Sequence, residues 1–427
     1  MLKKRILYND LRTIFLILIL SLVPLVGMGQ FQQVQPEAVG LSPDRLERLD
    51  QLIRKQIDEQ KMAGVNTLIL RDGKAAYFKS HGMMNIEERQ PMQKDAIFRI
   101  ASMSKAVTSV AVMILYEEGH FMLSDPVSDY IPAFKDPVVA VSDSTNGKGY
   151  RTVPAKRPIT IQHLLTHTSG LTYGNGVAHE AYEEADLSDW YFADEEEVSI
   201  GEKIKKLATL PLHSQPGEQW QYGYSTDVLG YFVEVVSGMP LDEFFNKRIF
   251  EPLGMNDTHF FLPPEKADRL APVYGINDDG DLELMEPTSS TDYIHGPRTC
   301  FSGGAGLMST ITDYGVFMQM LLNGGEFNGT RILSPSTVKL MHANHTGDMY
   351  AWGDLGFGLG FKVVEDLGEF GEIGTEGAYG WGSAYYPVYW IDPQKDMAFL
   401  FLTQLMPANG LPFRDLFPNM VYQAVVE

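Results

Sequence analysis

Ser102-Met103-Ser104-Lys105 stands at the head of an apolar run, residues 106–118, which ends at Gly119. Residues three apart share one face of a helix, so the Ser102 hydroxyl and the Lys105 amine can meet if the run is helical. A serine hydroxyl holds its proton tightly, but an amine that has lost its own proton in a dry pocket can accept it. The first turn of a helix also has free N–H groups that favour negative charge. The stretch therefore predicts a reactive serine at a helix start, and Gly119 predicts the helix end.

The Ser-x-x-Lys pattern is common by itself. A chain of this length contains about two copies by chance at typical residue usage, and Ser336-Thr337-Val338-Lys339 is the second. That copy follows Ser334-Pro335, which is typical of an ordinary helix start capped by a hydroxyl. The interpretation of Ser102 therefore depends on the rest of the chain.

Composition places the chain among ordinary globular proteins. Its 427 residues suffice for one large domain or two modest ones, and 44% are hydrophobic and 21% charged. A formal net charge of −21 and a pI near 4.9 argue against nucleic-acid binding, which needs a basic surface. Acidic residues gather within 180–202, among them Glu195-Glu196-Glu197, and we interpret this segment as a solvated loop rather than a cation site.

The N-terminus resembles a secretion signal. A positive leader precedes residues 13–26, which are almost wholly apolar, and the small residues Gly27 and Gly29 follow. The apolar run is shorter than the roughly 18 to 20 residues that a membrane span needs, and no cysteine nearby could carry a lipid. We therefore expect a cleavable signal peptide at 1–29 and an exported, periplasmic or secreted mature chain at 30–427. An uncleaved N-terminal anchor is the alternative.

No metal and no cofactor are expected. Cys300 is the single cysteine, so no disulfide can form within the chain, and a buried small residue is favoured over a catalytic thiol. His163 and His167 are four residues apart but lack the glutamate of a zinc-protease helix. No cluster of Cys and His has metal-ligand spacing.

Strand patterns lie near both ends of the chain. Residues 65–70 and 75–79 flank the turn sequence Arg71-Asp72-Gly73-Lys74, and residues 388–391 and 397–402 flank a second turn, so both predict hairpins. Apolar residues recur at helical spacing within 42–61, and 414–426 could form a closing helix.

These patterns predict an α+β fold of two lobes. An antiparallel sheet flanked by terminal helices would form one lobe, from about 38–100 and 331–427, and a mainly helical lobe would follow from about 101–330. A cleft between lobes is a common place for a site.

Several motifs in a fixed order resemble the serine β-lactamases of class C, with the related carboxylesterases and penicillin-recognising enzymes. The resemblance covers roughly residues 41–406 and implies the β-lactamase/transpeptidase-like fold. The motifs are Phe98-Arg99-Ile100-Ala101-Ser102-Met103-Ser104-Lys105, Leu164-Leu165-Thr166-His167-Thr168-Ser169-Gly170-Leu171, Pro216-Gly217-Glu218 with Trp220-Gln221-Tyr222, Asp227-Val228-Leu229-Gly230, Gly303-Gly304-Ala305-Gly306-Leu307, and Gly380-Trp381-Gly382-Ser383 with Trp390-Ile391-Asp392-Pro393.

The family also uses a tyrosine, commonly in Tyr-x-Asn, that moves protons. Tyr173-Gly174-Asn175 has the letters but sits just after Ser169-Gly170. Tyr222-Gly223-Tyr224 departs at its third position, yet its place before a helix resembles that of the esterase branch. The resemblance therefore favours Tyr222 over Tyr173, with Tyr224 beside the substrate.

The third element of the family is a strand that usually carries Lys-Thr-Gly, which this chain lacks. His345-Thr346-Gly347 imitates it without a strand pattern, whereas Trp381-Gly382-Ser383 resembles the Trp-Gly-Gly variant of esterases. The resemblance implies that Trp381, Gly382 and Ser383 contact the substrate. It also implies an oxyanion hole formed by the backbone N–H groups of Ser102 and Ala384.

The resemblance implies a serine hydrolase that acts through an acyl-enzyme, with Ser102, Lys105 and Tyr222 as catalytic residues. Because Trp381 replaces a charge that would hold a β-lactam carboxylate, a carboxylesterase of the family VIII-like branch is favoured. A β-lactamase or a D-amino-acid peptidase of the penicillin-binding type is the alternative, and a non-catalytic cell-wall ligand-binding protein is the alternative of another class. The expected partner is a small ester, amide or peptide substrate, with no nucleic acid and no stable membrane partner. Whether Lys105 or Tyr222 is the base stays open.

Overall fold

The computed structural model describes residues 31–145, 147–189, 198–350 and 355–427. The expected signal peptide and Glu195-Glu196-Glu197 lie outside the described residues. Within the described ranges, no helix is both long enough and apolar enough to cross a membrane.

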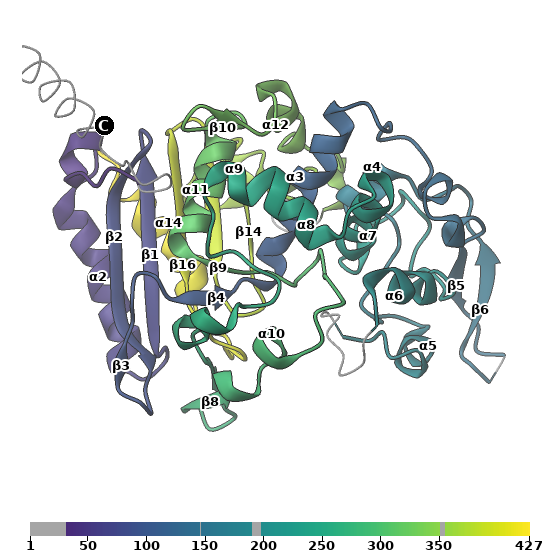
Figure 1. Cartoon of the computed structure of the whole chain (residues 1–427), viewed down its shortest axis with the longest axis horizontal. Coiled ribbons are helices and arrows are strands. Elements are labelled where there is room, and N and C mark those ends of the chain that lie inside the picture. Colours follow the sequence, from purple (N-terminus) through teal and green to yellow (C-terminus); the bar gives the residue numbers. More distant parts are fainter. Residues whose placement is uncertain (1–30, 146, 190–197, 351–354) are drawn as a thin grey trace, which may run out of the picture.

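An eight-stranded antiparallel sheet forms one side of the molecule (Figure 1). Its strand order is β12-β13-β14-β15-β16-β1-β2-β3, so strands from the two ends of the chain are neighbours, and β1 pairs with β16. Both predicted hairpins are confirmed, as β1–β2 and β15–β16. The strands are β1 Gly64–Arg71, β2 Lys74–Asn85, β3 Gln90–Pro91, β12 Leu355–Phe357, β13 Lys362–Val364, β14 Tyr379–Gly382, β15 Val388–Asp392 and β16 Met397–Leu402.

Helices cover both faces of this sheet because its central strands are apolar on both faces. Successive side chains of a strand point to opposite faces. Phe399 of β16 accordingly packs in the core beneath the terminal helices α2 (Pro43–Asp58) and α14 (Phe413–Tyr422), while the next residue, Leu400, lies in the core of the other face. Both terminal helices predicted from the sequence are thus confirmed.

The second face of the sheet is covered by α11 (Ile311–Leu322). This helix contacts β1, β15 and β16, although its residues fall within 101–330, the segment expected to form the helical lobe. The reason is physical: the apolar second face of the sheet needs a cover, and α11 is buried along almost its whole length.

On the far side of the molecule, helices gather around α7 (Figure 1), which contacts α3, α4, α6 and α8. α3 is buried on nearly all sides, as expected for a helix rich in apolar residues. The helices are α3 Ser104–Glu117, α4 Ile161–Leu165, α5 His179–Glu184, α6 Ile200–Leu207, α7 Ser225–Ser237, α8 Leu241–Phe245, α9 Glu251–Leu253, α10 Asp292–His295, α12 Pro335–Met341 and α13 Leu367–Phe370.

Short strands outside the main sheet pair locally or across long distances in the sequence. The pair β4–β9 joins the segment just before Ser102 to residues 308–310 and so fixes the approach to α3. The pairs are β4 Ile97–Arg99 with β9 Met308–Thr310, β5 Val138–Ser142 with β6 Tyr150–Pro154, β7 Val273–Ile276 with β8 Leu282–Glu286, and β10 Glu326–Phe327 with β11 Thr330–Arg331.

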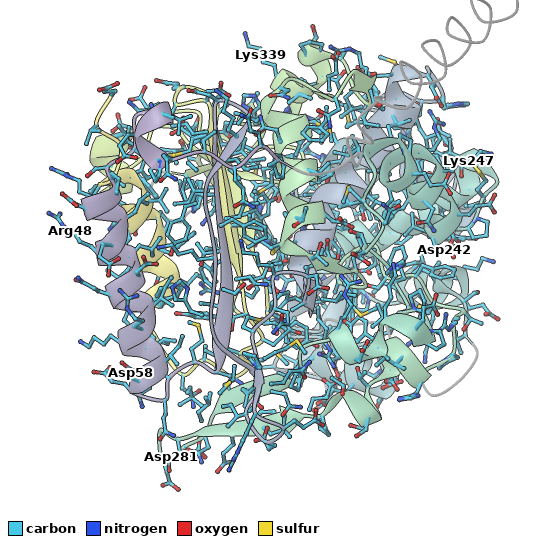
Figure 2. The ribbon with its side chains drawn as sticks, turned by 60° about the vertical axis from the view of Figure 1, so that its left-hand side comes forward. Arg48, Asp58, Asp242, Lys247, Asp281 and Lys339 are labelled. Atoms are coloured by element: carbon cyan, nitrogen blue, oxygen red, sulfur yellow. The ribbon has the colours of Figure 1, made fainter. Side chains whose placement is uncertain are left out.

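Many charged side chains lie at the periphery of the molecule, as expected for residues that are costly to bury. Figure 2 shows six of them at its edges: Arg48, Asp58, Asp242, Lys247, Asp281 and Lys339.

Candidate active site

Ser102 and Lys105 meet at the start of α3. Ser102 lies in a 3-10 turn, Ala101–Met103, that leads directly into the helix. The Lys105 Nζ lies 3.2 Å from the Ser102 Oγ, as the three-residue spacing predicts. Only 2% of Lys105 is exposed, so its amine is placed inside the protein rather than in solvent. Ala101 has a φ of +37°, a strained value for a non-glycine residue, and such strain concentrates at functional sites.

A buried loop holds Lys105 in place. Its Nζ donates to the carbonyl oxygen of Gly304 at 2.8 Å. Gly304 in turn donates its N–H to Asp227 Oδ1 at 3.0 Å, and the Ser302 hydroxyl donates to the same oxygen at 2.6 Å. A Cβ at Gly304 would lie 2.3 Å from Asp227 Oδ2, so only glycine fits. Residues 227 and 303–307 were noticed in the sequence as motifs, but their role as a support for Lys105 was not predicted.

The fully buried Asp227 supplies negative charge near the amine. Burial raises the pKa of Asp227, while Lys105 and the hydrogen bonds from Ser302 and Gly304 oppose that rise. Asp227 is therefore both an anchor for the loop and a countercharge for Lys105.

Tyr222 lies beside the amine and is connected to the strand β14. The Lys105 Nζ lies 4.7 Å from the centre of the Tyr222 ring. The Trp381 indole N–H donates to the Tyr222 hydroxyl at 3.2 Å. Because Ser102, Tyr222 and Trp381 also line one cavity, the structure brings together the three segments that the sequence singled out.

Tyr173 also lines this cavity, at a slightly greater distance from the amine. The Lys105 Nζ lies 5.8 Å from the Tyr173 ring centre. Burial first, and then Tyr222 and Asp227, raise the pKa of Tyr173 well above its usual value, so its phenol keeps its proton. This protonated phenol can donate a hydrogen bond but is a poor base.

Tyr224 does not contact the cavity, and the expectation that it lies beside the substrate is corrected. Its side chain is buried, its hydroxyl donates to the carbonyl oxygen of Asp189, and its ring packs edge-on against Tyr173 at 4.8 Å. The reason is that Tyr224 is the N-cap residue of α7, where its side chain turns into the core.

His167 is a neighbour of Tyr222 that the sequence noted without a role in this site. Its buried ring lies 4.9 Å from the Tyr222 ring, centre to centre, and its carbonyl oxygen accepts from the Gln221 N–H at 2.7 Å. Burial and the nearby Lys105 hold the pKa of His167 well below its usual value, so the imidazole is neutral. His167 also has a φ of +54°. The residue therefore supports Tyr222 through both its ring and its backbone.

The cavity has a volume of about 580 Å³ and runs from Ser102 along the end of β14. Trp381, Gly382, Ser383 and Ala384 all line it, as the resemblance implies. The other lining residues come from the sheet, from α14, from α13 with the loop after it, and from the segment before β12: Tyr350, Leu355, Lys362, Phe370, Glu372, Val388, Trp390, Arg414, Asp415 and Pro418.

The turn after β14 is held by its own hydrogen bonds. The Ser383 hydroxyl accepts from the Tyr385 N–H at 3.2 Å, and the Ser383 N–H donates to the Pro387 carbonyl oxygen at 2.9 Å. Ser383 is thus held by the turn itself. Ala384 is exposed, and its N–H donates to no carbonyl oxygen of the described residues.

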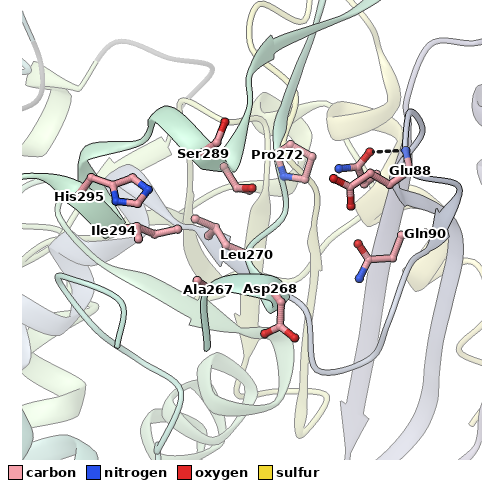
Figure 3. Close-up of a pocket in the computed structure, with 11 residues that line it drawn as sticks. Glu88, Gln90, Ala267, Asp268, Leu270, Pro272, Ser289, Ile294 and His295 are labelled. Carbon is pink, nitrogen blue, oxygen red and sulfur yellow. Dashed lines mark hydrogen bonds between the residues drawn. The ribbon is translucent and has the colours of Figure 1, made fainter. Parts of the chain in front are cut away.

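A second cavity, of about 670 Å³, lies near the end of β2 and the segment 267–295 (Figure 3). Polar groups such as Glu88, Gln90 and His295 line it, and the Glu88 N–H donates to Asn85 Oδ1 at 3.0 Å. None of Ser102, Lys105 and Tyr222 reaches this cavity. The candidate active site is therefore assigned to the first cavity, which Ser102 lines.

The other sequence features have structural explanations. Ser334 caps α12 by accepting from the Thr337 N–H, and Lys339 is exposed, so the second Ser-x-x-Lys copy is a helix start, as predicted. His345 precedes a short 3-10 turn rather than lying on a strand, and Cys300 is buried. In the described part of the chain, no three His, Cys, Asp or Glu side chains gather in a way that could hold a metal ion.

Comparison with known proteins identifies the family of this chain. The Beta-lactamase family profile matches residues 49–417. An uncharacterized protein of Mycobacterium tuberculosis is 36% identical over 373 residues, which cover 83% of this chain and 89% of that protein. Esterase EstB of Burkholderia gladioli is 28% identical over 374 residues, which cover 83% of this chain and 89% of EstB.

A solved structure shows the same fold. EstCE1, described as a hydrolase with promiscuous acyltransferase activity, superposes with a TM-score of 0.75 at 27% identity, over 90% of this chain and 99% of EstCE1. The α+β fold expected from the sequence is thus confirmed as the β-lactamase/transpeptidase-like fold. This chain belongs to the β-lactamase family and is a serine hydrolase of that family.

Proposed function

We propose that Ser102 attacks the carbonyl carbon of an ester and forms an acyl-enzyme that water then hydrolyses. The observation that carries the proposal is the Lys105 amine, which is buried, lies 3.2 Å from the Ser102 Oγ and adjoins the Tyr222 ring. A serine needs a base to become a nucleophile, and a base within hydrogen-bond reach meets that need.

The proton moves between three groups in this scheme. Lys105 or Tyr222 takes the proton of Ser102 as the oxygen bonds to the carbonyl carbon, and the departing alkoxide receives a proton through Tyr222. Water then gives a proton to the same base and attacks the acyl carbon, and Ser102 recovers its proton as it leaves. At the end of the cycle, Ser102 and the base have the same protons as at the start.

The negative charge on the carbonyl oxygen would be met by two backbone N–H groups. Ser102 supplies one from the first turn before α3, and Ala384 supplies the other from the exposed turn after β14. The support for Ala384 is that its N–H has no described carbonyl acceptor and lines the same cavity as Ser102. Such donors are each typically worth about 3 kcal/mol in the transition state.

Esters fit the reacting end of the cavity better than β-lactams. A β-lactam carries a carboxylate next to its reacting amide, whereas Trp381 places an uncharged ring there and binds the Tyr222 hydroxyl. Similarity to EstB and EstCE1 supports the same conclusion. We expect the protein to hydrolyse a short-chain p-nitrophenyl ester faster than a cephalosporin, and the opposite order would favour a β-lactamase.

A fluorescent phosphonate tests the nucleophile directly. We expect the wild-type protein to be labelled and Ser102→Ala to lose the label. Ser336→Ala is the matched control, because it removes the serine of the other Ser-x-x-Lys copy and should leave labelling unchanged. If the wild-type protein takes no label, a binding protein without catalysis becomes the better description.

We also propose that the protein is exported after cleavage near residue 29. The support is the positively charged leader and the apolar run that follows it. Expression of the full chain in a bacterial host, followed by N-terminal sequencing of the product outside the cytoplasm, should find a chain that begins near Gln30. A product that begins at Met1 and stays in the membrane fraction would show an uncleaved anchor instead.

A further inference from the structure

The cavity at Ser102 continues to a lysine on the strand next to β14. Lys362 of β13 pairs directly with Gly380 of β14, and Gly380 pairs directly with Trp390 of β15. Directly paired residues point to the same face of a sheet, and glycine leaves no side chain between its two partners. The Lys362 Nζ therefore lies across β14, 4.5 Å from the centre of the Trp390 ring. Lys362, Trp390 and Ser102 all line the one cavity.

The charge of Lys362 is incompletely compensated. In the described part of the chain, Asp415 pairs with Arg414 at 3.9 Å, and no carboxylate forms an ion pair with Lys362. Burial, followed by repulsion from Arg414, lowers the pKa of Lys362 to about 8, against the opposite effect of Glu372 and Asp415. The surroundings thus disfavour this half-buried cation even though the carboxylates of Glu372 and Asp415 line the same cavity.

We propose that Lys362 and Trp390 form a subsite for a carboxylate at the far end of the acyl chain of the substrate. This inference rests on the proposed function, because it names the substrate class of the same site. In the proposed scheme the leaving group departs towards Tyr222, so an acyl chain on Ser102 would extend through the rest of the same cavity, which Lys362 and Trp390 also line. A carboxylate at the end of the chain would form an ion pair with the positively charged Lys362. The methylene groups before it would lie against Trp390 and Val388. The substrate class is therefore half-esters of dicarboxylic acids.

Two substrates of equal chain length test the proposal. Mono-4-nitrophenyl adipate and 4-nitrophenyl hexanoate share a six-carbon acyl chain and a leaving group, and differ only by the terminal carboxylate. We expect the wild-type protein to prefer the adipate half-ester by about tenfold in kcat/KM, as for one charge-assisted hydrogen bond. The assay needs about 0.3 M salt, which screens the general repulsion between an anionic substrate and a protein of net charge −21.

Two variants test whether Lys362 causes the preference for the adipate half-ester. Lys362→Met keeps the length and the apolar contact with Trp390 but removes the charge, so the ratio of the two kcat/KM values should fall to about one. Lys339→Met, at an exposed lysine on α12, should keep the wild-type ratio. A wild-type ratio of one or below, or a Lys362→Met protein that keeps the preference, overturns the subsite.

Binding separates this inference from the proposed function. Calorimetric titration of Ser102→Ala with the two esters measures affinity without turnover, and the adipate half-ester should bind about tenfold more tightly. If neither ester is hydrolysed by the wild-type protein but this difference in affinity is found, the proposed function fails while the subsite stands. If both are hydrolysed and bound alike, only the subsite fails.

Discussion

The position of Lys105 depends on contacts that no single sequence motif describes. Its spacing from Ser102 could be predicted, because residues three apart on a helix always share a face. Its support by Gly304 and Asp227 could not, because that contact joins residues far apart in the sequence. Tyr224 was misplaced for a related reason: the letters around a helix start do not tell which way the cap side chain turns.

Replacing Asp227 should lower activity without lowering the stability of the fold. Asp227→Asn keeps the shape of the side chain but removes the negative charge that stabilises the Lys105 ammonium formed when the amine takes the Ser102 proton, so we expect kcat to fall about tenfold. Burial raises the pKa of Asp227, so the folded state disfavours its charge, and the variant should unfold at the same temperature or higher.

Ester hydrolysis and thermal unfolding measured together check this expectation. Asp281→Asn, at an exposed loop position, is the control and should change neither. An Asp227→Asn protein with full activity would show that the countercharge is dispensable.

His167 offers a test of what positions Tyr222. His167→Phe keeps an aromatic ring against Tyr222 but suits the positive φ poorly, whereas His167→Asn tolerates that φ and loses the ring. Since aromatic pairs contribute about 1 kcal/mol, we expect Asn to lower kcat roughly fivefold to tenfold and Phe to lower it less, at some cost in stability. The reverse order of kcat values would assign the role to the backbone of residue 167 instead of its ring.

At the scale of elements, strong local patterns were predicted well and short pairings were not. The helices α2 and α14 and both hairpins follow from apolar periodicity and turn residues. β4 and β9 have three residues each and pair across more than two hundred positions, so no local pattern announces them. α11 is buried on nearly all sides, and its sequence does not reveal which layer it joins.

The contact between α2 and β2 should show a defined pH dependence. Asp50 of α2 is buried and accepts from the Tyr77 hydroxyl at 2.5 Å and pairs with Lys79 and with His81 at 3.2 Å. Burial alone would raise the pKa of Asp50, but the hydrogen bonds from His81, Lys79 and Tyr77 outweigh it and hold the pKa well below its usual value. The ionised carboxylate therefore stabilises the fold above about pH 4, and this contribution is lost as the pH falls further.

We expect Asp50→Asn to lower the free energy of unfolding by about 2 kcal/mol near pH 7. The difference from wild type should shrink progressively below about pH 4. Urea unfolding at several pH values measures it. Glu47→Gln, in an exposed pair with Arg54, should change stability by less than about 1 kcal/mol, and a pH-independent loss in Asp50→Asn would contradict the assigned cause.

At the scale of the whole molecule, the site exists only because distant segments meet. Ser102 lies in the turn just before α3, Tyr222 precedes α7, and Trp381 lies on β14 of a sheet built from strands near both ends of the described chain. The order of motifs allowed their convergence to be predicted from resemblance. The extension of the cavity to Lys362 could not be foreseen, because it depends on the register of β13 against β14.

The rate of acyl-enzyme formation tests this convergence most directly. Stopped-flow mixing with a p-nitrophenyl ester measures it for wild type, Lys105→Ala, Tyr222→Phe and Tyr173→Phe, with unfolding curves to confirm that each variant is folded. If Lys105 and Tyr222 handle the proton of Ser102, their loss should slow acylation by about 10² to 10⁴-fold, while loss of the Tyr173 hydroxyl should slow it far less. Folded Lys105→Ala and Tyr222→Phe proteins that acylate at the wild-type rate would contradict the mechanism.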